Sequence, residues 1–138
     1  MSPTTQRRLA LTALLFLAAA CGSPAATPAR VFFTSPADGA TVSSPVHVTL
    51  STENFTVEPA GEVKAGAGHL HIMVDTACAA PGQVIIKDDT HLHYGQGQLE
   101  ADLELAPGPH TLCLQAADGA HTALSDAGLT QTIAITVQ

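Results

Sequence analysis

Histidine is the residue type in this chain whose number and spacing point to chemistry. There are seven histidines, against five lysines and arginines together. Four of them form two His-x-His pairs, His69 with His71 and His91 with His93. Neutral imidazole is a common ligand of copper(II) and zinc. The two pairs therefore predict a copper or zinc site, with His121 as a further candidate ligand from a late loop.

A β-strand is the element that would place both members of each pair on one face. Successive side chains of a strand point to opposite sides, so His69, His71 and Met73 share a face opposite Leu70 and Ile72. The second pair, by the same alternation, shares a face of its own strand. Neighbouring strands lie about 5 Å apart, so two adjacent strands would bring four imidazoles together. A thioether on the same face would also suit copper(I).

Histidines also have ordinary structural roles, which leave a second interpretation open. A histidine on an exposed sheet face is a solvated polar residue, which we expect of His47, and a buried one often orients a loop, which we expect of His110. Asp89 is near enough in sequence to orient His91. The alternative function is thus a non-catalytic, immunoglobulin-like structural or interaction module without metal, which unchanged behaviour after metal removal would favour.

The sequence predicts that short β-strands position these histidines. Alternating apolar runs are separated by clusters of Pro, Gly and Asp, which is typical of β-sandwiches, and no amphipathic helix is evident. We predict an all-β fold, an immunoglobulin-like antiparallel β-sandwich of about eight or nine short strands over residues 30–138. The predicted strands fall at 31–34, 46–51, 55–58, 69–75, 84–87, 91–94, 99–105, 110–116 and 133–137.

The N-terminal segment predicts export. Arg7 and Arg8 precede an apolar run at 9–20, which is shorter than the roughly 20 residues that span a bilayer. The run ends at Ala-Ala-Ala-Cys-Gly-Ser, which resembles the lipobox of bacterial lipoproteins. We predict a signal peptide over 1–20, lipidation of Cys21 and a flexible tether over 21–29 in the cell envelope, on the outer membrane if the host is Gram-negative. An ordinary secretory signal followed by a stray cysteine is the alternative.

The two remaining cysteines predict a disulfide. Cys78 and Cys113 are an even pair, and exported proteins meet an oxidising compartment. Since Cys113 alternates with Leu112 and Leu114, the bridge should hold the loop after Asp75 on the outer side of the sheet. A pair of soft-metal ligands is the alternative for these thiols.

The net negative charge of the chain limits which molecules it can bind. The chain carries 12 acidic and 5 basic residues; removal of 1–20 takes Arg7 and Arg8, so 3 − 12 gives a net charge of −9. Such a chain cannot form the basic surface that neutralises phosphates, which argues against nucleic acid and anionic headgroups. We expect the membrane as a partner through the lipid anchor alone, and an envelope protein of unspecified identity.

Several blocks of the sequence resemble the bacterial secreted domain of unknown function 4399. They are residues 33–46, Gly68-His69-Leu70-His71, the His-Leu-His-Tyr-Gly block at 91–95, and 105–112. The resemblance runs from about Val31 to Val137, and the two histidine blocks are its most specific parts. It implies export and a β domain and brings no established activity. Leu70 stands where that family often has a third histidine.

Catalytic motifs are scarce. The sequence has no Gly-x-Ser-x-Gly elbow, phosphate-binding glycine loop or dinucleotide fingerprint. The nearest enzyme template is copper-zinc superoxide dismutase, to which the block at Gly68 and the downstream Cys78 are faintly similar. The spacing differs, because His69 follows the glycine directly, and past the predicted signal peptide Arg30 is the one arginine available to steer an anion. We therefore predict a metal-binding envelope lipoprotein that is not an enzyme, with the dismutase as a remote alternative.

Overall fold

The structure is a computed structural model that describes residues 27–138. The predicted signal peptide and the predicted lipidation site, Cys21, lie outside the described residues. Of the predicted tether, Thr27 to Ala29 are described; they have no regular structure and lead directly into the first strand. No helix in the described part of the chain has the length and apolar character needed to cross a membrane.

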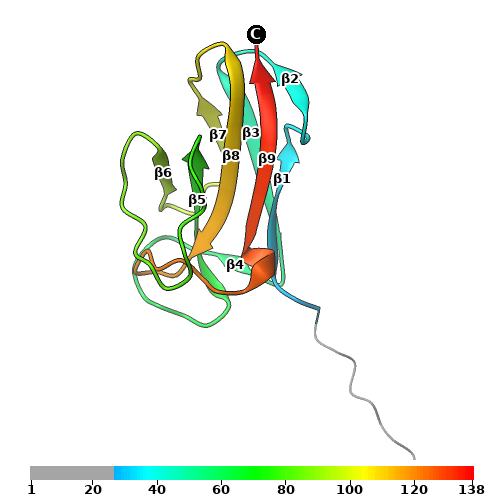
Figure 1. The fold of residues 1–138 in the computed structure, drawn as a ribbon. Coiled ribbons are helices and arrows are strands. Elements are labelled where there is room, and N and C mark those ends of the chain that lie inside the picture. The colour runs from blue at the N-terminus through cyan, green and yellow to red at the C-terminus, as the bar shows by residue number, and fades with distance from the viewer. Residues whose placement is uncertain (1–26) are drawn as a thin grey trace, which may run out of the picture.

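Two β-sheets face each other across a common core (Figure 1). The smaller sheet has the order β1-β3-β7, with β1 (Arg30–Ser35), β3 (Val46–Glu53) and β7 (Glu100–Leu103). The larger sheet has the order β2-β9-β8-β5-β4, with β6 also pairing with β5. Its strands are β2 (Ala40–Val42), β4 (Thr56–Val57), β5 (Ala67–Val74), β6 (His91–Tyr94), β8 (Gly108–Ala117) and β9 (Thr130–Val137).

The predicted all-β sandwich is confirmed. The described chain contains nine strands and one short 3₁₀ turn, η1 (Ala127–Leu129). Most strand pairs are antiparallel, but β2 pairs with β9 and β4 with β5 in parallel. Parallel neighbours need a connection that crosses back, so these two pairs depart from the predicted antiparallel pairing.

Alternating side chains fill the space between the sheets. Val46, Val48 and Leu50 of β3 are buried, while His47 between them is exposed as predicted. The same alternation in β9 buries Ile133 and leaves its neighbours more accessible. These strands therefore have one face in the core and one in solvent.

Strand β5 differs because both of its faces are buried. All eight of its residues are buried; Leu70 and Ile72 belong to the main core, and Met73 packs on the other side in a second apolar cluster. That cluster includes Ile85 and Ala123, which come from the connections β5–β6 and β8–η1. These two connections cover the outer face of the larger sheet.

The apolar run 84–87 is not a strand, contrary to the prediction. Val84 makes one isolated bridge to Thr122, and the segment otherwise lacks strand pairing. Ile85 is 4% exposed, whereas Ile86 is 67% exposed. The run buries a single side chain, and its one bridge does not extend into a ladder, so it does not join a sheet. The predicted strand 99–105 is also shorter, at Glu100–Leu103.

The predicted disulfide is present. Cys78 and Cys113 are bridged, with their Cα atoms 5.6 Å apart. Cys113 lies in the second apolar cluster, opposite Met73 across the β5–β8 pairing. The bridge therefore holds the β5–β6 connection to the outer side of the larger sheet, as the alternation in β8 predicted.

Candidate metal centre

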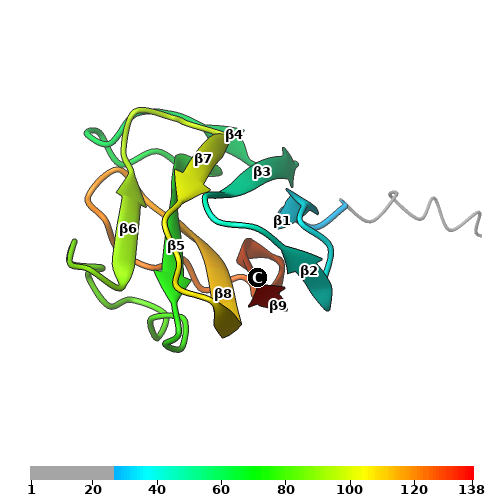
Figure 2. The same ribbon diagram turned by 90° about the horizontal axis from the view of Figure 1, so that it is seen from above.

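Strands β5 and β6 are neighbours, and their register decides which histidines meet. Figure 2 shows β6 beside β5 at one side of the larger sheet. In this antiparallel pair His93 lies opposite His71, and His91 lies opposite Met73. Residues directly opposite on one face have Cβ atoms about 5 Å apart. Register alone therefore brings His93 to the buried pair of β5 and places His91 one step further along the strand.

His121 reaches the same place from a tight turn after β8. Asp118 Oδ1 accepts hydrogen bonds from the N–H groups of Ala120 and Thr122, at 2.8 and 2.9 Å. His121 has a positive φ of 66°, an uncommon conformation for a residue with a side chain. The turn directs its ring so that Nδ1 lies 2.8 Å from Nε2 of His69.

Four imidazoles converge as a result. One ring nitrogen from each of His69, His71, His93 and His121 lies within 4.8 Å of the other three. Nε2 of His71 is 3.0 Å from Nε2 of His69. Around a zinc or copper ion bound at about 2.0–2.1 Å, neighbouring nitrogens stand about 3 Å apart and opposite ones about 4 Å. The widest separation in this group, up to 4.8 Å, is somewhat longer than that, so small ring movements would close the group around such an ion.

Hydrogen bonds account for only part of the convergence of these rings, because Nε2 of His69 is within hydrogen-bond distance of ring nitrogens of His71 and His121. Among the described residues, Nδ1 of His69, Nδ1 of His71 and Nε2 of His93 are buried without a hydrogen-bond partner. A neutral imidazole carries its N–H on either ring nitrogen. Because no partner lies near Nδ1 of His69, this atom stays unpaired in both tautomers. Each buried unpaired polar atom costs about 1–3 kcal/mol. A cation would replace the close nitrogen–nitrogen contacts with coordinate bonds.

Burial keeps the deepest rings neutral. Desolvation, followed by repulsion from the neighbouring histidines, lowers the pKa of His71 to about 3. The same causes lower the pKa of His69 to about 4, against a smaller opposing effect of Asp118. Burial, His121 and Lys87 lower the pKa of His93. Neutral imidazole is the form that binds metal.

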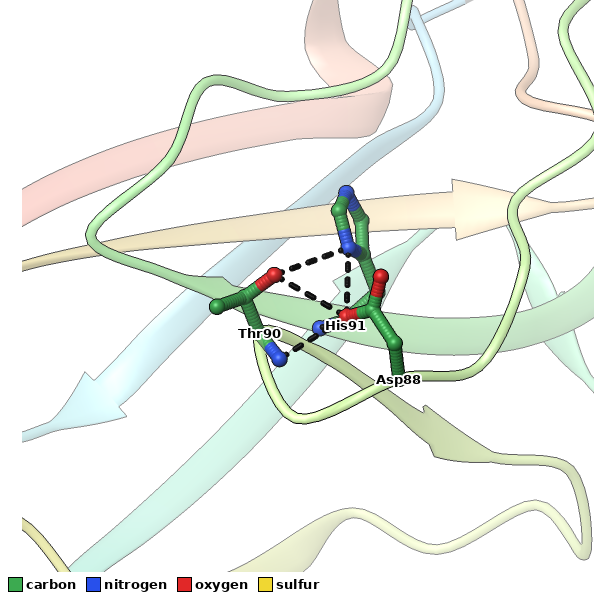
Figure 3. Close-up of polar contacts among 3 residues, drawn as sticks. All are labelled: Asp88, Thr90 and His91. Carbon is green, nitrogen blue, oxygen red and sulfur yellow. Dashed lines mark hydrogen bonds and ion pairs between the residues drawn. The ribbon is translucent and has the colours of Figure 1, made fainter.

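His91, one of the four paired histidines predicted as ligands, does not join this group, and His121 takes its place. Its Nδ1 lies 2.8 Å from Oδ1 of Asp88, the hub of the polar contacts in Figure 3. The same oxygen accepts hydrogen bonds from the N–H of Thr90, the hydroxyl of Thr90 and the N–H of His91. These bonds, His91 first, hold the pKa of Asp88 well below its ordinary value. The oriented histidine was anticipated, but its partner is Asp88 and not Asp89.

Two other histidines have the roles the sequence predicted. Nδ1 of His110 contacts Oδ2 of Asp75 at 2.7 Å, and its Nε2 donates to the carbonyl of Ala106 at 2.8 Å, so His110 orients a loop. His47 pairs with Asp102 at 2.8 Å, and both side chains are more than half exposed. Neither histidine belongs to the group of four.

Two glycines near the histidines were not identified from the sequence as part of the candidate site. A Cβ on Gly95 would overlap the imidazole of His93, and one on Gly68 would collide with the carbonyl of Ala117. Both glycines flank His-x-His pairs, which is the signal that could have identified them. They allow the close approach that positions the rings.

The matched region contains the whole group of four. Residues 48–138 match the profile of a family described as a domain of unknown function, DUF4399. The chain belongs to the DUF4399 family. The suspected resemblance is thereby confirmed, and the match includes the four converging histidines and both cysteines of the disulfide. Strands β1 and β2 lie before the matched region of this DUF4399 domain.

No curated protein matches this chain in sequence. One solved structure with similarity is an endo-β-1,4-mannanase from Thermotoga petrophila, with 16% sequence identity and a TM-score of 0.49. The alignment covers 82% of this chain and 20% of the mannanase chain. The chain thus spans one-fifth of that enzyme, and a likeness this distant carries no argument about its function.

Proposed function

We propose that this DUF4399 protein binds one copper or zinc ion through His69, His71, His93 and His121. The observation that carries the proposal is the convergence of four ring nitrogens within 4.8 Å, drawn from two strands and a turn. Two of the rings are fully buried and held neutral, and three ring nitrogens lack a hydrogen-bond partner among the described residues.

The donor set indicates which ions suit the site. All four donors are imidazole nitrogens. The two thiols form the disulfide, and the carboxylate of Asp88 is hydrogen-bonded to His91. Nitrogen sites suit copper(II) and zinc, and copper(II) binds more tightly in the usual divalent order. Copper(II) is therefore expected to bind more tightly than zinc. Met73, whose thioether would suit copper(I), packs in the second apolar cluster with Cys113 and Ile85.

A binding role fits this site better than a catalytic one. Four protein ligands complete a tetrahedral zinc site, whereas catalytic zinc sites keep a position open for water or substrate. With all four imidazoles bound, the ion is held by protein alone. The proposed role is therefore to hold or deliver the metal and not to catalyse a reaction.

The proposed place of action is the cell envelope. The N-terminal apolar run and Cys21 support an exported lipoprotein anchored by lipid. The disulfide supports the same compartment, because thiols persist in reduced form in the cytosol of most cells.

Calorimetric titration of the purified full chain with copper(II) and with zinc tests the metal site. Wild type should bind both, and His71→Ala and His93→Ala should each lose at least about tenfold in affinity. His47→Ala is the matched control, because His47 is an exposed histidine outside the group. Binding no tighter than about 1 mM by wild type, or equal binding by all three variants, would overturn the proposal and favour a module without metal.

A further inference from the structure

One irregular segment connects the disulfide to the metal site. Residues 76–90, here called the cover segment, join β5 to β6 across the outer face of the larger sheet. Within 80–90 only Ile85 is buried, and Val84 and Ile86 are among the most exposed apolar side chains described. The segment therefore has little apolar burial of its own to hold it in place.

The first anchor of the cover segment is at its beginning. The disulfide joins Cys78 to Cys113 of β8. Directly beside it, the buried side chain of Gln115 accepts a hydrogen bond from the N–H of Ala79 and donates one to the carbonyl of Ala79, both at 2.9 Å. Gln115 lies opposite His71 in the β5–β8 pairing. This anchor is therefore beside the buried part of the metal site.

The second attachment is to the turn that carries His121. The N–H of Ile85 donates to the carbonyl of His121 at 2.8 Å. The N–H of Gly82 donates to the carbonyl of Ala123, and the N–H of Ala123 donates to the carbonyl of Gln83, both at 2.8 Å. His121 has the unusual positive φ that its neighbours must maintain. The cover segment thus supports the one ligand that does not lie on a strand.

We propose that the Cys78–Cys113 disulfide is a redox switch that controls metal affinity. While the disulfide is intact, the cover segment stays on the sheet and holds the backbone of His121. Reduction releases the segment, loosens the turn and leaves three strand-borne histidines to bind the ion. This inference rests on the proposed function and specifies its regulation: the metal is held tightly in the oxidised protein and more weakly after reduction.

The reductant is a dithiol, such as the reduced form of a thiol–disulfide oxidoreductase. Its thiolate attacks Sγ of Cys78, which is partly exposed beside an open depression lined by Thr76, Thr111 and Thr132. Cys113 is 1% exposed, so its sulfur is the leaving group and takes up a proton. The second thiol of the dithiol then resolves the mixed disulfide. Two electrons and two protons pass to the protein, and the dithiol becomes a disulfide.

Zinc titration of a protein that cannot form the disulfide tests the switch. In the full chain, Cys78→Ser with Cys113→Ser removes the disulfide without leaving soft thiols near the site. Its zinc affinity should be about 10- to 100-fold lower than that of oxidised wild type, the size usual for losing a supporting contact. His121→Ala should weaken binding in wild type and have little further effect in the double serine variant, because the same ligand is already lost.

Hydrogen exchange of wild type supplies a measurement that does not depend on a variant folding. After reduction by dithiothreitol, the amides of Ile85 and Ala123 should lose protection, while those of Leu112 and Leu114 in β8 keep it. Unchanged protection at Ile85 and Ala123 would overturn the switch, as would equal zinc affinity of wild type and the double serine variant. Failure of oxidised wild type to bind zinc or copper would instead overturn the proposed function.

Discussion

Small differences in backbone position decide which histidines join the group of four. His91 and His93 are on the same face of β6, yet one is held by Asp88 and the other lies opposite His71. A shift of the β5–β6 register by two residues would place His91 opposite His71 and move His93 opposite His69. The proposed metal site therefore depends on residues that fix register and backbone approach as much as on the histidines themselves.

Gly95 is such a residue, and its substitution gives the first prediction. In Gly95→Ala the new methyl group would occupy the space of the His93 ring, so the ring must move away from the other three. Copper and zinc affinity should fall by about as much as in His93→Ala, roughly tenfold or more by calorimetry. Adding Gly95→Ala to His93→Ala should have no further effect. A Gly95→Ala protein that binds like wild type would contradict this placement of His93.

The pair of His110 and Asp75 gives a prediction on pH. A hydrogen bond to the carbonyl of Ala106, with the contact to Asp75, raises the pKa of His110. Its contribution to the free energy of unfolding is therefore fully present below pH 6.5 and is lost as pH rises through the raised value. Urea unfolding should show His110→Gln less stable than wild type by up to about 1 kcal/mol near pH 5.5, with a smaller gap near pH 8.5. A gap that grows toward high pH would contradict the assignment.

Asp75 sets the acid limit of that pair. Burial acts to raise its pKa, but the N–H of Thr111 and the ring of His110 outweigh burial and lower it. Its contribution is present above pH 3.8 and is lost as pH falls through the lowered value. The contribution of the pair should therefore be largest between about pH 4 and 6.5, which unfolding of Asp75→Asn across the same pH range checks.

At the scale of elements, alternation predicted most of what the strands do. The apolar positions of β3 and β9 identified their buried faces, and the two His-x-His pairs identified the side of the sheet that carries the site. The pairing of β5 with β6 followed from their order in the chain. The outer covering was not predictable in the same way. It consists of two segments, 76–90 and 118–126, whose sequences show no strand or helix periodicity. Their hydrogen bonds join residues more than 30 positions apart in the chain. That covering buries the face of β5 that lies opposite the main core.

The covering layer can be tested through two adjacent isoleucines. Ile85 is 4% exposed in the second apolar cluster, and Ile86 is 67% exposed. Truncation of a buried isoleucine typically costs about 2–5 kcal/mol, whereas exposed positions usually stay within about 0.5 kcal/mol. Ile85→Ala should therefore lower the free energy of unfolding in urea near the low end of the first range, since the cluster is small. Ile86→Ala is the matched control, and equal effects would show that the segment does not pack as described.

The whole molecule combines two sheets, a covering layer and one site that joins them. The four proposed ligands come from β5, β6 and the turn after β8, so a bound ion would tie three separate parts of the chain together. An ion that binds only the folded form stabilises it by about 2.7 kcal/mol at 100 times its dissociation constant. The proposed ion and the disulfide would therefore both stabilise the covering layer on the outer face of β5 and β8.

The last prediction concerns how the molecule is held at the membrane. Strand β1 begins at Arg30, directly after the predicted tether, so a lipid on Cys21 would leave the entire sandwich and its metal site free in the envelope. A single acyl chain binds membranes only marginally, and the diacylglyceryl group of lipoproteins supplies the second chain that stable anchoring needs. Intact mass of membrane-extracted protein should show a mature chain that begins at Cys21 with lipid attached. Cys21→Ala should remove the protein from the membrane fraction, while Cys78→Ser, the matched control, should stay anchored. Cleavage at another position, or an unmodified thiol at Cys21, would contradict the anchor and leave a secreted domain that diffuses freely.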